Sequence, residues 1–196
     1  MALTNEIVKQ RLVEKFGEQL IDWGEPYGML TFTAPKDLNL KVLQFLYDDE
    51  QLHFKFLADL QAVHYPDKKG AELAVVYHVH NLKDNIRIRF KVFADITKPD
   101  VFSATALFQS ANWMERETYD FFGVNFLGHP NLIRVLNVDE MDYFPMRKEF
   151  PLEDQSRIDK DDEMFGRGGS VGFGTQKGTH HDTIAEDEKP EPKNEV

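Results

Sequence analysis

The first half of the chain contains two hydrophobic spacings, one typical of helices and one typical of strands. Near the N-terminus apolar residues fall on every fourth position, which predicts a helix capped by Thr4 or Asn5. A second helix is predicted after Pro35, because apolar side chains again share one helical face there. Short β-rich or alternating runs predict strands at 29–33 and 52–56. The N-terminal half should therefore combine helices with strands.

The strongest strand signal is a predicted β-hairpin in the middle of the chain. Apolar residues alternate with other residues over 73–79 and again over 86–92, and the polar residues 83–85 between them suit a turn. The polar positions of the second run are basic; they are Arg87, Arg89 and Lys91. The hairpin is therefore expected to bury one face and to present a basic outer face.

A third helix, predicted over 110–123, does not separate its charged residues from its aromatic residues. At roughly 100° per residue, Trp113 shares one side with Glu117, and Glu115 lies beside Phe122. A surface helix normally has one apolar face and one polar face. A charge among large aromatic side chains must be paired, because burying it alone costs several kcal/mol. We therefore expect this helix to be enclosed on more than one side, by its own domain or by a second protein as well.

The composition changes near the end of the chain. Two prolines in the segment 144–152 predict an extended conformation there. Residues 153–196 include 12 acidic and 6 basic residues, so they carry −6 of the formal net charge of −11. They also hold half of the 12 glycines and few residues that could build a core. We therefore expect a domain over 1–152 and an acidic, extended or disordered tail over 153–196.

Charge and composition exclude several classes of function. The acidic balance disfavours binding to nucleic acid or to an anionic membrane surface. No apolar run approaches the roughly 20 residues that span a bilayer, and the N-terminus does not resemble a signal peptide, which suggests a bacterial cytoplasm. The chain has no cysteine, which excludes disulfides and conventional iron–sulfur clusters in it. If electrons matter here, they should travel in another subunit.

Three patterns suggest chemistry, and each also has a structural explanation. His78 and His80 have the spacing of two metal ligands, but no third ligand is evident and nearby basic residues repel a cation. The glycine-rich run 166–174 lacks the lysine and hydroxyl pattern of a phosphate-binding loop. Candidate acid–base residues are Glu115, Glu117, Asp120 and His129. A structural ion-pair network or a solvated helix face explains this last group better than catalysis.

Two motifs together resemble a known family. Residues 110–123, Ser-Ala-Asn-Trp-Met-Glu-Arg-Glu-Thr-Tyr-Asp-Phe-Phe-Gly, are followed by Gly-His-Pro at 128–130. This combination resembles the signature of the C subunit of bacterial NADH-quinone oxidoreductase, the 30-kilodalton subunit family of respiratory complex I. The later Arg-Lys-Glu-Phe-Pro-Leu at 147–152 is similar to the second family motif, in which Asp usually stands at the position of Glu149. The resemblance covers roughly residues 1–152, and the hairpin over 77–89 is also similar to the family.

The chain departs from the family pattern at two positions. The family commonly has a basic residue where Ile133 stands, so in this chain Arg134 must supply the positive charge. His64 stands where an acidic residue is usual. These departures affect particular ion pairs, and they leave the resemblance of the two motifs intact.

The resemblance implies a two-layer α+β domain with a mixed sheet, and a peripheral-arm subunit without a cofactor. In the family this subunit packs against the D subunit, which helps to build the quinone site, and the B and I subunits are further expected partners. FMN and iron–sulfur clusters in partner subunits would carry electrons from NADH to quinone, while protons are translocated. The implied location is the cytoplasmic face of the bacterial inner membrane, with membrane contact only through the complex. The alternative is a homologous docking subunit of a membrane-bound hydrogenase-type or related dehydrogenase complex.

We expect the motif residues to serve structure and docking, with no catalytic residue among them. They are Trp113, Glu115, Arg116, Glu117, Asp120, Phe121, His129, Pro130, Arg134, Arg147 and Pro151. The charged members and the histidine are expected to form one buried network that fixes the third helix against the proline-containing segment. A free-standing hydrolase that uses the same acids and histidine is the contrasting hypothesis.

Overall fold

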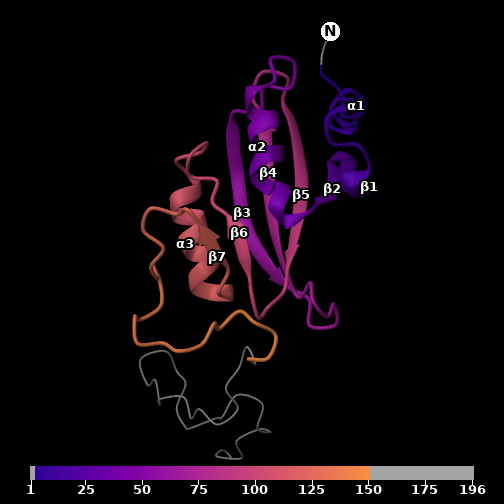
Figure 1. The fold of residues 1–196 in the computed structure, drawn as a ribbon. Coiled ribbons are helices and arrows are strands. Elements are labelled where there is room, and N and C mark those ends of the chain that lie inside the picture. Colours follow the sequence, from indigo (N-terminus) through magenta and orange to yellow (C-terminus); the bar gives the residue numbers. More distant parts are fainter. Residues whose placement is uncertain (1–2, 151–196) are drawn as a thin grey trace, which may run out of the picture. The chain divides into compact units, whose positions relative to one another are not determined.

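The computed structural model describes residues 3–150, and Figure 1 shows their arrangement. The elements in chain order are α1 (Asn5–Phe16), η1 (Gly17–Gln19), β1 (Ile21–Gly24), η2 (Pro26–Gly28), β2 (Leu30–Ala34), η3 (Lys36–Leu38), α2 (Asn39–Asp48), β3 (Phe56–His64), β4 (Leu73–Asn81), β5 (Ile86–Ala94), β6 (Asp100–Phe102), α3 (Ala111–Phe122) and β7 (Asn125–Leu127). The predicted tail 153–196 lies outside the described residues. Within 3–150, no helix has the length and apolar character that a membrane span requires.

The main sheet is mixed, which confirms the predicted α+β class. Its strand order is β1-β2-β5-β4-β3; β2 and β5 run parallel, and the other neighbouring strands run antiparallel. The predicted hairpin is confirmed as β4 and β5, which pair along their whole length. Its turn is closed by Asn81, whose side-chain oxygen accepts the N–H groups of Lys83 and Asp84.

Aromatic rings pack against one another across the buried face of this sheet. Phe32, Phe90 and Tyr77 are direct cross-strand neighbours on β2, β5 and β4, with ring centroids 5.4 and 4.7 Å apart. Trp23 extends the row, 4.8 Å from Phe32. α2 lies across this face (Figure 1), where Asn39 donates a hydrogen bond of 3.1 Å to the Tyr77 hydroxyl. The row of aromatic rings therefore stabilises the sheet. The buried hydroxyl of Tyr77 has a hydrogen-bond partner, as buried tyrosine hydroxyls usually do.

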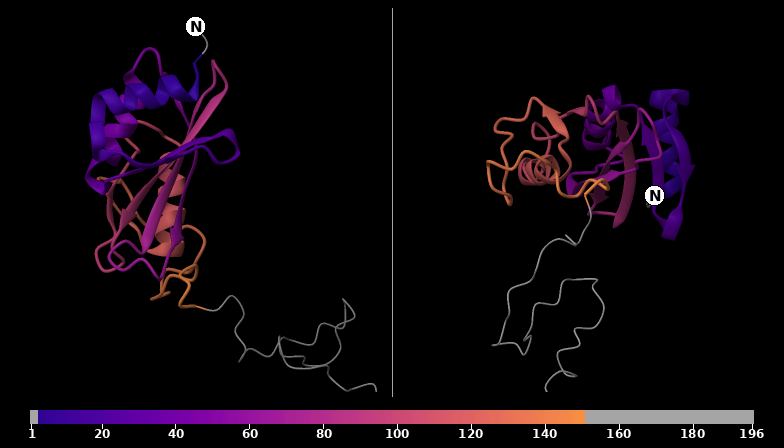
Figure 2. Two further views of the ribbon diagram at one scale, coloured as in Figure 1. Left: turned by 90° about the vertical axis from the view of Figure 1, so that its right-hand side faces the viewer. Right: turned by 90° about the horizontal axis from the view of Figure 1, so that it is seen from below.

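α3 lies beside the edge strand β3, as both Figure 1 and Figure 2 show. It begins after Ser110, as predicted, but the Ser110 side chain makes no capping hydrogen bond, because its backbone is already helical. Gly123 ends the helix with a left-handed φ of 76°, which confirms the predicted stop. The short strands β6 and β7 precede and follow α3, and they pair with each other in parallel.

The strand predicted at 52–56 is wrong, because β3 begins only at its last residue. Leu52 and Phe54 are indeed buried, but they belong to an irregular segment in which His53 has a left-handed φ of 48°. The N–H of Phe54 donates to the carbonyl of Leu46 in α2. The alternating pattern therefore comes from a turn that inserts two side chains into the core.

The proline-containing segment before residue 150 is not helical, but it is not extended either. It forms successive turns, in which the N–H of Arg147 donates to the carbonyl of Phe144 and the N–H of Phe150 donates to the carbonyl of Arg147. Pro145 is compatible with this arrangement, because a proline suits the second position of a turn. The prolines correctly exclude a helix here, but the prediction of an extended conformation is wrong.

Candidate functional site

The last turn of α3 has an unusual set of hydrogen-bond partners. The last four carbonyls of a helix have no partner within the helix. In α3 each of them accepts a hydrogen bond, and three of the donors come from the loop that follows β7. The pairs are the Gly123 N–H to Tyr119 at 2.8 Å, Arg134 to Asp120 at 2.9 Å, the Met146 N–H to Phe121 at 3.1 Å and Arg147 to Phe122 at 2.8 Å. The two signature motifs therefore meet at the end of this helix.

Asp120 is the centre of a buried polar cluster, which we define as Asp120, Arg134 and residues 135–137. The Asp120 carboxylate is fully buried, and it lies 2.7 Å from an Arg134 guanidinium nitrogen. It also accepts the three backbone N–H groups of 135–137 at 2.8–3.0 Å, together with the Asn137 side-chain amide. Burial alone would raise the pKa of Asp120, but these donors outweigh it and hold that pKa well below its usual range.

Phe144 packs the loop against the end of α3. Its ring contacts the guanidinium groups of Arg134 and Arg147, whose central carbons are 5.2 and 4.7 Å from the ring centroid. A Cβ at Gly123 would lie 2.5 Å from this ring, so only glycine fits there. The glycine that ends α3 thus also allows the close approach of the loop.

The first turns of α3 are joined to the same loop through a histidine and an arginine. The His129 Nε2 donates to the carbonyl of Asn112 at 3.1 Å, while its Nδ1 accepts the N–H of Asn131 at 3.0 Å. Arg116 donates to the carbonyls of Ile133 and Arg134, both at 3.2 Å. Its guanidinium lies over the Trp113 ring, 4.8 Å from the centroid. The loop is therefore fixed along much of the helix.

Glu115 is buried separately from these groups. Its carboxyl oxygens accept the Ser103 hydroxyl at 2.7 Å and the Ala104 N–H at 2.6 Å, and no basic side chain of the described residues pairs with it. Burial raises the pKa of Glu115 to about 7, and the two hydrogen bonds only partly oppose this effect. The group is therefore partly protonated at neutral pH, and it joins the start of α3 to the segment after β6.

The expected single network is wrong in this respect: the structure divides its members into separate groups. Asp120 follows Glu115 by five residues, which places the two side chains roughly 140° apart around the helix. Arg147 binds a backbone carbonyl of α3 instead of the acids of the helix. Glu117 is exposed, as is Trp113 four residues before it. Their shared side of α3 is therefore open within the described residues.

The remaining predicted residues occupy the surroundings of these groups. Phe121 is half-buried and contributes its carbonyl to the end of the helix, and Pro130 is exposed in the turn before the loop. Pro151 lies outside the described residues. The Glu115 side chain is fixed by hydrogen bonds to Ser103 and Ala104, which precede the helix. Its predicted position beside Phe122 does not determine its orientation.

Large apolar side chains are exposed on α3 and on the loop that its polar groups hold. Trp113, Leu136 and Val138 expose 63, 64 and 63% of their surface. Ile133 and Met146 are also exposed on this loop. We call Trp113, Ile133, Leu136, Val138 and Met146 the apolar loop surface. Exposed apolar side chains on a rigid backbone are typical of a protein–protein interface.

Several residues of the site could not be found from the sequence. Ser103 and Asn137 are ordinary polar residues, and nothing in their spacing indicates that they bind Glu115 and Asp120. His64 stands out in the sequence only because it departs from the family pattern. It is buried at the end of β3, where its Nδ1 accepts the N–H of Lys148 at 2.9 Å. An acidic side chain could accept the same hydrogen bond, which explains the exchange physically.

The candidate metal ligands lie on the sheet face that points away from α2. The register pairs His78 with Arg89 and His80 with Arg87, so all four side chains share one face. His78 lies 3.4 Å from Asp59, and His80 contacts Asn85. Within residues 3–150, no group of three histidine, aspartate or glutamate side chains is placed to hold a metal ion. The predicted glycine-rich loop 166–174 lies outside the described residues.

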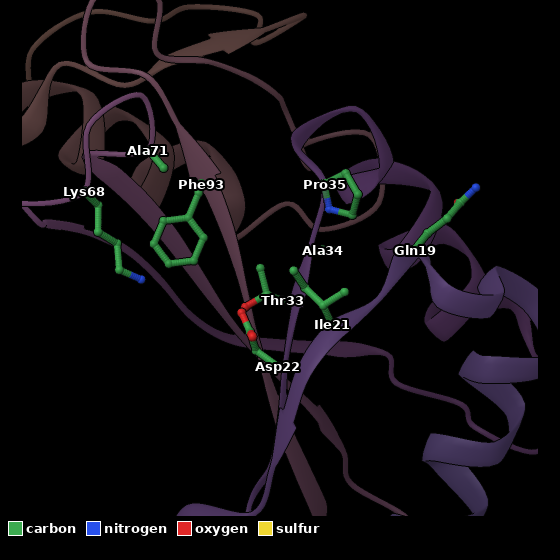
Figure 3. Close-up of a pocket in the computed structure, with 9 residues that line it drawn as sticks. All are labelled: Gln19, Ile21, Asp22, Thr33, Ala34, Pro35, Lys68, Ala71 and Phe93. Atoms are coloured by element: carbon green, nitrogen blue, oxygen red, sulfur yellow. The ribbon is translucent and has the colours of Figure 1, made fainter.

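A cavity of about 310 Å³ is formed by elements other than α3 and is shown in Figure 3. It is lined by Gln19, Ile21, Asp22, Thr33, Ala34, Pro35, Lys68, Ala71 and Phe93. None of the candidate acid–base residues of α3 is among them. The two buried carboxylates of α3, Glu115 and Asp120, already accept hydrogen bonds from neighbouring segments. The site around α3 is therefore suited to holding a loop in place.

Comparison with known proteins gives consistent results. The family model for the 30-kilodalton subunit of respiratory-chain NADH dehydrogenase matches residues 32–156. The C subunit of NADH-quinone oxidoreductase from Citrifermentans bemidjiense is 42% identical over 159 residues, which cover 80% of this chain and 95% of that protein. The protein of the same name from Nocardioides sp. is 43% identical over 125 residues, which cover 64% of this chain and 50% of that protein. The chain therefore spans about half the length of that second relative.

Two solved structures have a similar fold. A trypsin-resistant fragment (1–134) of Nqo5 is 29% identical, with a TM-score of 0.55; the match covers 64% of this chain and 98% of the fragment. A chain from the structure of the membrane-bound sulfane sulfur reductase, an archaeal respiratory membrane complex, has a TM-score of 0.64 at 23% identity. That match covers 75% of this chain and 85% of the other, and it shows the fold alone.

Proposed function

Because the chain belongs to the family of the 30-kilodalton subunit of respiratory-chain NADH dehydrogenase, we propose that it is a docking subunit of an NADH-quinone oxidoreductase. In this proposal it holds neighbouring subunits in the peripheral arm, and FMN and iron–sulfur clusters in those subunits carry the electrons to quinone. It takes part in the reaction of the complex without a catalytic residue or cofactor of its own. The assembly stands at the cytoplasmic face of the membrane.

The apolar loop surface carries this proposal. A free-standing enzyme gains nothing from exposing Leu136 and Val138, whereas a subunit buries them when its neighbour binds. The Asp120 cluster fixes the backbone of this same loop, so little conformational entropy is lost on docking. We assign the loop to the D subunit, the partner expected from the resemblance, with the B and I subunits as further neighbours.

The relatives favour NADH-quinone oxidoreductase over a hydrogenase-type complex. Two proteins named as the C subunit of NADH-quinone oxidoreductase are 42% and 43% identical to this chain. The archaeal respiratory complex contributes a similarity of fold, and a shared fold alone does not specify function.

We expect the double variant Leu136→Asp, Val138→Asp to prevent assembly without unfolding the chain. Both side chains are already exposed, and only the backbone N–H of Leu136 takes part in the Asp120 cluster, so the isolated variant should remain folded, which circular dichroism checks. Two carboxylates in an apolar interface should lower the amount of variant recovered with the D subunit by at least about tenfold. The measurement is affinity purification of tagged protein from a strain that lacks its own copy, together with NADH:quinone activity of the membranes.

Leu82→Asp is the matched control, because Leu82 is equally exposed, at 66%, but lies in the β4–β5 turn. It should assemble like the wild type. Normal assembly and activity of the double variant would contradict the docking role of the loop. A wild-type chain that is purified alone and turns over a small substrate would contradict membership of the assembly altogether.

A further inference from the structure

The sheet face that points away from α2 carries a row of basic side chains. Arg87, Arg89 and Lys91 stand at alternate positions of β5, so they point to the same side over about 13 Å of strand. The register places His78 and His80 on β4 beside the two arginines. This face is therefore locally basic on a chain whose formal net charge is −11.

The row has little compensation within the described residues. No carboxylate of residues 3–150 lies within ion-pair distance of Arg87, Arg89 or Lys91. On the β2 side of the face, Thr31 receives a hydrogen bond from Arg89 at 3.3 Å. Two acids border the row: Asp59 on β3, which is paired with His78, and Asp22 on β1, which lines the cavity with Thr33, the cross-strand neighbour of Lys91. Side-by-side like charges at alternate positions repel one another, so the row is set to receive an anionic partner.

Apolar side chains stand at both ends of the basic row. Phe56 on β3 is exposed beside His80, with ring centroids 6.5 Å apart. At the other end, Phe93 continues the alternation of β5 and lines the 310 Å³ cavity together with Ile21 (Figure 3), and the ammonium of Lys68 lies 4.3 Å from its ring centroid. A strip that is apolar at its ends and basic between them matches an extended peptide with carboxylates at alternate positions.

We propose that this face docks an acidic, extended segment of a neighbouring subunit, with its carboxylates on Arg87, Arg89 and Lys91. This inference rests on the proposed function, because it needs a neighbour in the same assembly. It adds a second contact surface, built from other elements than the apolar loop surface. The spacing along one strand and the apolar ends favour a peptide over a lipid headgroup, which would engage one phosphate at one point.

The first test reverses charge in the assembled complex. The double variant Arg87→Glu, Arg89→Glu should reduce recovery of the tagged chain with the complex at least about tenfold at an ionic strength of about 0.15 M, since like charges then meet. The matched control is Lys15→Glu, Lys41→Glu, which reverses two exposed charges on α1 and α2 and should assemble normally. Circular dichroism of each isolated chain establishes that it is folded. If the Arg87→Glu, Arg89→Glu variant is recovered with the complex as fully as the lysine control, the proposal is overturned.

The second test uses the wild-type chain, so it does not depend on how a variant folds. Phenylglyoxal labels accessible arginines, and mass spectrometry measures the labelling of Arg87 and Arg89. Both should be labelled in the isolated chain and labelled at least about tenfold less in the purified complex. Unchanged labelling in an assembled, active complex would overturn this inference and leave the proposed function standing. Binding of the isolated chain to phosphatidylglycerol vesicles, lost in the double variant, would assign the face to lipid and overturn the proposal as well.

Discussion

Replacing Asp120 with alanine is expected to lower the free energy of unfolding by about 3–5 kcal/mol, because it breaks a buried ion pair and leaves Arg134 without its partner. The three backbone N–H groups of 135–137 lose their acceptor at the same time. The backbone of residues 135–137 should then detach from the end of α3. Urea unfolding measures the change in stability, and hydrogen exchange should show faster exchange of the amides of residues 135–137.

Asp142→Ala is the control for this variant, because Asp142 is an exposed acid of the same loop. It should unfold within about 0.5 kcal/mol of the wild type. A loss of less than about 1 kcal/mol in the Asp120 variant, with unchanged exchange at 135–137, would mean that the cluster does not hold the loop. The depressed pKa of Asp120 adds a pH signature: its contribution to stability is present above about pH 4 and declines as the pH falls below that value.

Replacing Glu115 with glutamine is expected to change how stability depends on pH. The pKa of Glu115 is about 7 in the folded chain and near its ordinary value of 4.5 in the unfolded chain. The folded state therefore binds the proton more tightly, and wild-type stability falls as pH rises from about 4.5 to 7 and then levels off. A tenfold difference in proton affinity corresponds to about 1.4 kcal/mol, so the loss should approach about 3 kcal/mol.

The glutamine variant should lack this loss, since its amide stays neutral and can still accept the Ala104 N–H and bond with Ser103. At about pH 8 it should therefore be more stable than the wild type, whereas at about pH 4 the two should be similar. Glu117→Gln is the matched control, two residues along the same helix and exposed, and its stability profile should follow the wild type. The measurement is urea unfolding at a series of pH values. Parallel profiles of the Glu115 variant and the wild type would contradict the raised pKa.

Sequence patterns predict the elements in which one periodicity dominates. The hairpin of β4 and β5 and the end of α3 at Gly123 are local features, determined by alternation along each strand and by a left-handed glycine. The segment 52–56 misleads because burial alternates there without a strand ladder. The backbone turns at His53, which has a positive φ. An alternating pattern of apolar residues cannot distinguish such a turn from a strand.

The candidate site is only partly predictable, because its partners are distant in sequence. A helical wheel indicates which side Asp120 and Glu115 occupy, but not that one meets Arg134 and the other meets Ser103. The sequence suggests that Arg147 joins one network with the acids of α3, because opposite charges attract. A helix end offers free carbonyls that an arginine satisfies equally well, and this second possibility is visible only once the chain is folded.

The end of α3 also sets a condition on biosynthesis. Two of the four carbonyls receive their donors from Met146 and Arg147, which leave the ribosome after the whole of the helix. Until those residues emerge, the carbonyls of Phe121 and Phe122 lack these donors, and the ring of Phe144 does not yet pack against Gly123. A premature stop codon shortly before Met146 should therefore yield a polypeptide that keeps its strands, while the last turn of α3 frays.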